Sequence, residues 1–163
     1  MTRLMAALLS SSWVLSSSAA DLNAQPRKPA PKPVVYKVGD VVGNFKLPDV
    51  DGKEVSLSDF KGRPIFVHYF RKDCGHCREE SPLIEKEIWR PFRDQGLVVL
   101  GLTLDAPDVA KAYMKENDLT FTVLIDKDRE FMRSLEVTGV PSTIVIGHDG
   151  KVLYNKEIGR AHV

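Results

Sequence analysis

The chain has 163 residues, the length of one ordinary domain, and its 43% apolar and 28% charged residues are typical of a globular protein rather than a disordered one. Its 23 Lys and Arg against 22 Asp and Glu argue against a nucleic-acid-binding protein, which needs a basic excess or stripe, and its 2 cysteines exclude a disulfide-dense miniprotein. No apolar run approaches the ~20 residues needed to span a bilayer, so we expect no membrane span in the mature chain.

Residues 1–20 have the features of a secretory signal peptide. Arg3 gives a positive start, residues 4–15 form a short apolar stretch, and Ser18 and Ala20 supply the small side chains that precede a cleavage site. We therefore predict export, with cleavage near Ala20 and a periplasmic or other extracytoplasmic location. Because serines interrupt the apolar stretch, a disordered N-terminus and an organellar transit peptide stay open as alternatives.

Residues 21–37 are predicted to be a proline-rich linker. The 4 prolines within residues 24–33 prevent a helix and favour extended polyproline II structure. At ~3.1 Å per residue this segment is a spacer of about 30 Å, with a proline-rich binding ligand as the alternative. We place the folded domain at residues 38–163.

The folded domain begins with a predicted β-hairpin. Residues 41–48 and 53–57 flank Asp51-Gly52, a strong signal for a tight hairpin turn. The run 65–70 is short, β-branched and aromatic, as expected of a buried strand. The hairpin therefore precedes the first strand of a central sheet.

A long helix is predicted over residues 73–93. Apolar residues recur at i, i+4 and i+8 on one face, and Pro82 is expected to kink the helix. Gly96 ends it, and the apolar run 97–104 is the next buried strand.

Helices and strands alternate along the rest of the domain. Asp105 or Ala106 caps a helix that has Pro107 at its favoured first position, and Asp126 or Asp128 starts a short helix that ends at Leu135. Strands are expected at 121–125, 141–146 and 152–158, the last two joined by a turn at 148–150. This order predicts the α/β class, with a central mixed β-sheet, helices on both faces and an N-terminal hairpin extension.

The chemistry of the chain is expected at Cys74-Gly75-His76-Cys77, where the buried strand meets the long helix. Unpaired backbone N–H groups and the positive dipole end of a helix N-terminus stabilise a thiolate on the first cysteine. The second cysteine lies one turn into the helix, within disulfide reach, and can resolve a mixed disulfide formed by the first. The motif therefore predicts thiol–disulfide exchange without a metal or an organic cofactor.

Two other roles of the cysteine pair stay open. A bridge that closes about four residues stabilises by only ~2 kcal/mol in the chain-entropy model, against ~3 kcal/mol for fifteen residues, which disfavours a purely structural disulfide. A structural zinc site needs about four ligands. The chain offers Cys74, Cys77 and His76 and has no second cysteine pair.

Three segments resemble, in order and at compatible spacing, the TlpA/ResA-like thiol–disulfide oxidoreductases, exported members of the thioredoxin superfamily. They are Leu-Ser-Asp-Phe-Lys-Gly at 57–62, Cys-x-x-Cys-Arg-x-Glu-x-Pro at 74–82 and Gly-Val-Pro-Ser-Thr at 139–143. The resemblance covers about residues 38–159 and implies a thioredoxin-like fold. It also implies that Cys74 is the nucleophile and Cys77 the resolving thiol.

The resemblance further implies that the Val140–Pro141 bond is cis and faces the disulfide, which leaves the Val140 backbone free to pair with a substrate peptide. From the residues alone, a trans proline that opens an edge strand stays open. Two features depart from the family pattern. Residues 71–73 place two cations and an acid where an aromatic and a small residue are usual, which is expected to alter partner choice. The family's C-terminal helix after Gly159 is expected to be missing, leaving one sheet face exposed or covered by another element or subunit.

Two ionisable residues are candidates for proton handling. The family glutamate that matches Glu80 lies near the disulfide and tunes thiol protonation, with a solvated helix acid as the alternative. His68 stands at the position of the buried aspartate of thioredoxin, where it is either the base for Cys77 or a hydrogen-bonded core histidine. Gly75 and His76 are expected to contact the substrate. When protonated, His76 makes the disulfide more oxidising.

The sequence thus predicts an exported enzyme that reduces disulfides of partner proteins through Cys74 and Cys77. Its expected partners are cysteine-containing exported proteins and a separate thiol electron donor. One alternative is a peroxiredoxin-like thiol peroxidase, disfavoured because Val67 and Arg71 stand where that family has Pro and Thr or Ser. The other is a non-enzymatic Cu(I) carrier, since soft thiolates select that ion.

Overall fold

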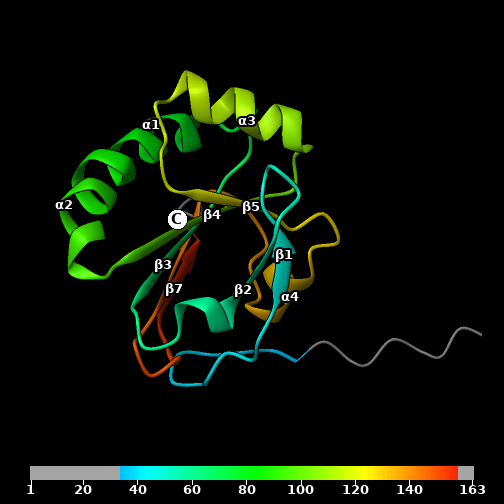
Figure 1. The fold of residues 1–163 in the computed structure, drawn as a ribbon. Coiled ribbons are helices and arrows are strands. Elements are labelled where there is room, and N and C mark those ends of the chain that lie inside the picture. The colour runs from blue at the N-terminus through cyan, green and yellow to red at the C-terminus, as the bar shows by residue number, and fades with distance from the viewer. Residues whose placement is uncertain (1–33, 158–163) are drawn as a thin grey trace, which may run out of the picture. The chain divides into compact units, whose positions relative to one another are not determined.

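The structure, a computed structural model, describes residues 34–157 (Figure 1). The predicted signal peptide and most of the predicted linker lie outside the described residues. The expectation that a C-terminal helix is missing concerns the segment beyond Glu157, which also lies outside them. No helix within the described range has the length and apolar character needed to cross a membrane.

A mixed sheet of 5 strands, in the order β5-β4-β3-β6-β7, forms the centre of the described chain. β3 pairs in parallel with β4 and antiparallel with β6, so the strand that leads to the cysteines is central and has neighbours on both sides. The strands are β1 (Lys46–Pro48), β2 (Glu54–Ser56), β3 (Ile65–Tyr69), β4 (Val98–Thr103), β5 (Thr122–Ile125), β6 (Ser142–Ile146) and β7 (Val152–Glu157). The helices are η1 (Leu57–Phe60), α1 (Gly75–Leu83), η2 (Ile84–Trp89), α2 (Arg90–Phe92), η3 (Arg93–Gln95), α3 (Pro107–Glu116) and α4 (Glu130–Ser134).

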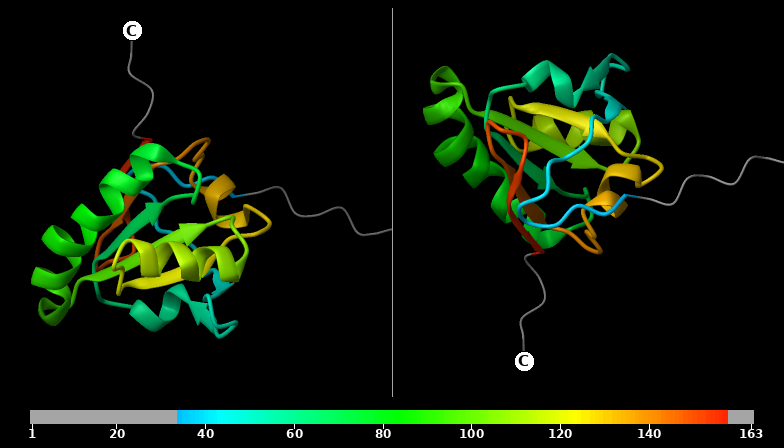
Figure 2. Two further views of the ribbon diagram at one scale, coloured as in Figure 1. Left: turned by 90° about the horizontal axis from the view of Figure 1, so that it is seen from above. Right: turned by 90° about the horizontal axis from the view of Figure 1, so that it is seen from below.

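Helices cover both faces of the sheet, as predicted. Figure 2 shows the long helical run that starts at α1 and the short α4 on opposite sides of the strands. Side chains alternate along β3, so Val67 and Tyr69 pack with α4 and the N-terminal hairpin, whereas Phe66 and Phe70 pack with α1 and α3. Fully burying an apolar side chain of this size contributes ~1.5–3 kcal/mol, so the two clusters hold the helices on the sheet.

The predicted hairpin forms but is shorter than expected. β1 and β2 pair around the turn at Asp51-Gly52, while Val41 instead makes a bridge with Lys151 next to the β6–β7 turn. The second strand ends early because the backbone N–H of Ser56 donates to the Asp59 carboxylate at 2.9 Å, which fixes the start of the 3₁₀ helix η1. The first half of the predicted strand therefore forms no strand, and its one β-bridge is the isolated one between Val41 and Lys151.

The single predicted helix over 73–93 is a continuous series of helical segments with different hydrogen-bond patterns. Pro82 lies inside α1, and the π-helical segment η2 begins two residues later. A proline has no backbone N–H and removes one bond from the ladder, so the interruption takes the form of a change in pattern. The series ends at Gly96, whose φ of 95° only glycine adopts easily.

Candidate active site

A disulfide joins Cys74 and Cys77 where the chain leaves β3 and enters α1. The two Cα atoms are 5.2 Å apart. Cys74 is the N-cap of α1, and its Sγ accepts the backbone N–H of Cys77 at 3.1 Å. Cys74 is partly exposed whereas Cys77 is fully buried. Only the first sulfur is therefore accessible to another protein, and it already receives an N–H donor that would stabilise a thiolate.

The charged residues before the motif are anchored to the loop that precedes α3. The Asp105 carboxylate accepts the backbone N–H of Lys72 at 2.7 Å and lies 3.6 Å from the Arg71 guanidinium. Arg78 in turn donates from Nε to the Lys72 carbonyl at 3.2 Å. The surface before the cysteines is thus charged and held in place by these contacts, rather than flat and apolar. Arg71 and Lys72 are called the charged lip below.

Gly75 and His76 lie on the surface between the cysteines. The His76 side chain is 81% exposed, and its Nδ1 is 3.5 Å from the Glu79 carboxylate. A side chain added at Gly75 would meet no atom within 4 Å. Both residues therefore stand in open space beside the accessible sulfur.

The Val140–Pro141 peptide bond is cis, as the resemblance implied. It directly precedes β6, which pairs with β3 on the side away from β4. Val140 packs against both apolar clusters, and Cys74 packs against the one that contains Cys77. The fold therefore brings the turn before β6 to the same end of the sheet as the cysteines.

Glu80 lies one turn beyond Cys77 on α1 and is half-buried. Its Oε2 is buried and has no hydrogen-bond partner in the described part of the chain. Burial raises the pKa of the Glu80 carboxyl above its ordinary value. This carboxyl therefore exchanges protons closer to neutral pH than an exposed glutamate does.

His68 is fully buried on β3 and takes part in a chain of polar side chains beneath α1. Its Nε2 is 2.9 Å from Ser81 Oγ, and Ser81 Oγ is 2.9 Å from the hydroxyl of Tyr113 on α3. Burial lowers the pKa of His68 to about 3, so the imidazole is neutral at physiological pH. Sequence reasoning missed Ser81 and Tyr113. The available signal was a serine four residues after Cys77 on the inner face of the helix.

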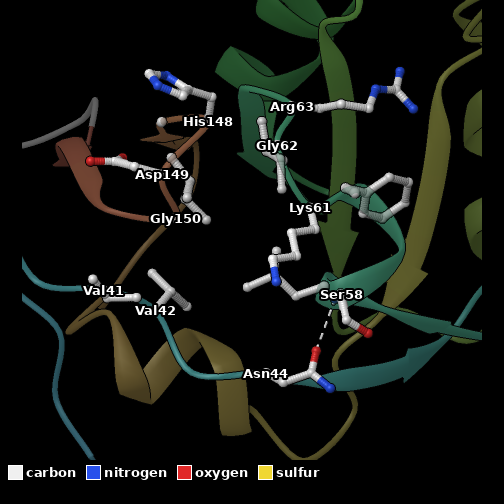
Figure 3. Close-up of a pocket in the computed structure, with 15 residues that line it drawn as sticks. Val41, Val42, Asn44, Ser58, Lys61, Gly62, Arg63, His148, Asp149 and Gly150 are labelled. Atoms are coloured by element: carbon white, nitrogen blue, oxygen red, sulfur yellow. Dashed lines mark hydrogen bonds between the residues drawn. The ribbon is translucent and has the colours of Figure 1, made fainter.

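A cavity of about 350 Å³ lies elsewhere, at the start of β3 and beside the turn between β6 and β7 (Figure 3). Lys61 extends into it between Val42 and Ser58, while His148 points away. Because the disulfide follows the other end of β3, this cavity is not part of the cysteine site. Among residues 34–157, no three His, Cys, Asp or Glu side chains are grouped so that they could hold a metal ion.

Comparisons with known proteins agree with this geometry. The profile of the AhpC/TSA family matches residues 38–155. The thiol-disulfide oxidoreductase ResA of Bacillus thuringiensis subsp. konkukian is 33% identical over 118 residues, which are 72% of this chain and 68% of that protein. A thiol:disulfide interchange protein from Bacteroides sp. is 26% identical, with a TM-score of 0.67 over 74% of this chain and 82% of the other. The peroxidoxin BcpB of Mycobacterium tuberculosis, 21% identical with a TM-score of 0.66 over 75% and 86%, shares the fold.

Proposed function

Because the chain belongs to the AhpC/TSA family and is a ResA-like thiol–disulfide oxidoreductase with a thioredoxin-like fold, we propose that it reduces disulfides of cysteine-containing partner proteins. The observation that carries the direction of attack is the unequal exposure of the two sulfurs. Cys74 is accessible at the helix N-terminus, and Cys77 is buried one turn further on. We therefore assign Cys74 as the nucleophile and Cys77 as the resolving thiol.

The reaction consists of two exchange steps. In the dithiol form, the Cys74 thiolate attacks one sulfur of the partner disulfide, and the other partner sulfur leaves as a thiolate. Cys77 then loses its proton and attacks Cys74 Sγ, which releases the second partner sulfur as a thiolate. Two electrons have passed to the partner, and the chain holds the Cys74–Cys77 disulfide. A separate dithiol donor restores the reduced form by the same two steps in reverse.

Glu80 is the better of the two candidate proton acceptors for Cys77. An ordinary thiol has a pKa of roughly 8.5, so proton transfer to an imidazole whose pKa is about 3 is strongly uphill. The carboxyl of Glu80 has a pKa raised by burial and an unpartnered oxygen, which favours it as the group that takes the thiol proton. His68 then serves as a neutral hydrogen-bonding group.

A partner protein is proposed to dock on the surface formed by Gly75, His76 and the Val140–Pro141 turn. Gly75 leaves room for close approach of a second backbone, and the exposed His76 can contact it. The backbone of Val140 supplies hydrogen-bonding groups for an extended peptide. The charged lip of Arg71 and Lys72 borders this surface and selects among partners.

Replacing Glu80 by Gln is expected to slow the reduction of a protein disulfide by dithiothreitol about tenfold at neutral pH, because Cys77 loses its proton acceptor. Relative to the wild type, the same variant is expected to become more stable as pH rises. The pKa of Glu80 is higher in the folded state than in the unfolded state, so the wild type loses stability as pH rises from the unfolded-state pKa through the folded-state pKa, whereas glutamine stays neutral. Rates and urea unfolding are measured at intervals from pH 4 to 8.

Glu87→Gln is the matched control, because Glu87 is an exposed glutamate in η2, the helical segment that follows α1. It is expected to keep wild-type rates and unfolding midpoints. An unchanged rate in Glu80→Gln would remove the glutamate from the mechanism. Consumption of hydrogen peroxide by the wild-type chain, without reduction of the protein disulfide, would replace the proposed function with that of a peroxidase.

Export is proposed from the signal-like features of residues 1–20. N-terminal sequencing of the mature protein is expected to begin near Asp21. A mature chain that still begins at residue 1 would contradict export by this route.

A further inference from the structure

The cavity of about 350 Å³ at the start of β3 takes no part in the cysteine chemistry, because the disulfide follows the other end of that strand. Its walls come from three segments that are far apart in the sequence, within 41–44, 57–65 and 146–150 (Figure 3). The volume is at the lower end of the range of ~300–1,000 Å³ for small-molecule pockets, and it is roughly twice that of a cavity that admits benzene. The cavity is therefore large enough for a small organic ligand.

Most of the side chains that line the cavity are apolar. Ile65 and Ile146 are direct partners in the β3–β6 ladder and are both buried, so their side chains lie next to each other on one face of the sheet. Leu57 and Phe60 of η1 are partly buried against the same apolar cluster. The apolar lining residues are Val41, Val42, Leu57, Phe60, Ile65 and Ile146. Covering this surface with the apolar body of a ligand is favourable, because it removes the surface from water.

Lys61 brings a positive charge to this apolar surface. Its side chain extends into the cavity (Figure 3), and its ammonium group makes no ion pair or hydrogen bond within residues 34–157. Arg63 is already engaged, since its Nε donates to the Gly96 carbonyl at 2.9 Å. Among the described residues that line the cavity Asp149 is the only acid, and its carboxylate lies 3.1 Å from Lys151 Nζ. The cavity thus offers a positive charge that no acid of its lining compensates.

Hydrogen bonds between the three segments hold the walls in place. The backbone N–H of Val42 donates to the Gly150 carbonyl at 2.9 Å, which joins the N-terminal segment to the turn between β6 and β7. The backbone N–H of Ser58 donates to the side-chain carbonyl of Asn44 at 3.0 Å, which joins the same segment to η1 (Figure 3). Because the walls are already ordered, a ligand that binds here loses little affinity to the ordering of protein groups.

We propose that this cavity binds a small carboxylate with an apolar body, such as a medium-chain fatty acid. The carboxylate pairs with the Lys61 ammonium, and the hydrocarbon lies on Ile65, Ile146 and the apolar side chains around them. A neutral apolar molecule leaves the ammonium without a partner, and a small inorganic anion leaves the apolar lining exposed to water. The site is separate from the cysteines, so the proposal does not rest on the proposed function.

The test is a titration of the oxidised full chain with octanoate below its micelle concentration, followed by ¹H–¹⁵N correlation spectra. We expect saturable shifts of the amides of Gly147 and Gly150, which belong to the cavity wall. Acetate has the same charge without the apolar body and is expected to cause no saturable shift. The absence of saturable shifts at these amides with octanoate, or an acetate response equal to that of octanoate, would overturn the proposal.

The role of the charge is tested with Lys61→Met, which keeps an unbranched side chain and removes the ammonium. This variant is expected to bind octanoate about fivefold more weakly, the effect of one ion pair in contact with water, and to bind 1-octanol as the wild type does. Lys61→Arg keeps the charge and is expected to retain the affinity for octanoate.

Lys115→Met is the matched control, because Lys115 is an exposed lysine on α3, which packs on the other face of the sheet. It is expected to bind octanoate as tightly as the wild type. Equal octanoate affinities of the wild type and Lys61→Met, or an equal loss of affinity in Lys61→Met and Lys115→Met, would overturn the proposed pairing with Lys61.

Discussion

Replacing Cys74 by serine is expected to abolish protein-disulfide reduction, and replacing Cys77 by serine is expected to trap the partner as a mixed disulfide. The accessible sulfur at the helix N-terminus makes the first attack, so without it no covalent intermediate forms. Without the buried sulfur the intermediate forms but is not resolved from within the chain. Non-reducing gels and mass spectrometry of the reaction with a disulfide-bonded substrate distinguish the two results.

The reduced wild-type chain, in which the disulfide is open, is the reference for the folded state of both variants. Cys74→Ser, at the partly exposed position, is expected to unfold at nearly the same urea concentration as that reference. Cys77→Ser places a hydroxyl in a buried apolar cluster and is expected to lose about 1–3 kcal/mol of stability while remaining folded. Full activity of Cys74→Ser would contradict the mechanism. Mixed disulfides that accumulate in Cys74→Ser rather than in Cys77→Ser would reverse the two roles.

Replacing Asp126 by alanine is expected to cost about 3 kcal/mol of folding free energy or more. The carboxylate is fully buried and accepts hydrogen bonds from the Tyr69 hydroxyl at 2.8 Å and from the backbone N–H groups of Met132 at 2.8 Å and Phe131 at 3.4 Å. It therefore ties β3 to the start of α4. Alanine leaves these buried donors without an acceptor, each at a cost of ~1–3 kcal/mol.

Urea unfolding of Asp126→Ala and of the control Asp128→Ala measures this effect. Asp128 lies two residues further along the same loop, but its side chain is exposed. The control is expected to change stability by less than about 0.5 kcal/mol. Equal losses in the two variants would mean that the buried hydrogen bonds contribute little and that the loop responds to any substitution.

The parts of the fold that were predicted correctly from the sequence are those whose structure is determined by residues close together in the chain. The β-branched and aromatic run of β3 and the Cys-x-x-Cys motif after it define a strand and a helix start without reference to any distant residue. The turn at Asp51-Gly52 was placed correctly for the same reason, since the two residues select a tight turn by themselves. The predicted mixed sheet with helices on its faces is also confirmed, because alternating helices and strands leave few ways to build a sheet.

The features that sequence did not predict depend on contacts between distant segments. The Glu85 carboxylate in η2 accepts the backbone N–H of Thr120 at 2.8 Å, its hydroxyl at 2.6 Å and Arg90 Nε at 2.9 Å, which holds the π-helical turn against the start of β5. Likewise, Ser81 lies 13 residues from His68 and 32 from Tyr113. Such pairings follow from the packing of whole elements. A local pattern can place Ser81 on the inner face of its helix, but it does not identify the distant partners.

The start of α4 shows a second reason why helix boundaries are hard to predict from sequence. Asp126 or Asp128 was predicted to begin this helix. The Asp126 carboxylate does cap it, but the helix itself starts at Glu130. Arg129 adopts a left-handed conformation with φ of 57° in between. An aspartate can cap a helix from several residues before its first turn, when a loop folds the carboxylate back onto the helix. In the sequence, such an aspartate cannot be distinguished from one that directly precedes the first turn.

The reduction potential of the Cys74–Cys77 pair tests the proposed reductase most directly. The chain is equilibrated with dithiothreitol or glutathione buffers of known ratio, and the free thiols are trapped and counted. We expect a potential near or below roughly −270 mV, which makes the dithiol form an electron donor to partner disulfides. A potential between roughly −180 and −120 mV would contradict the proposal, because such a disulfide oxidises or isomerises its partners.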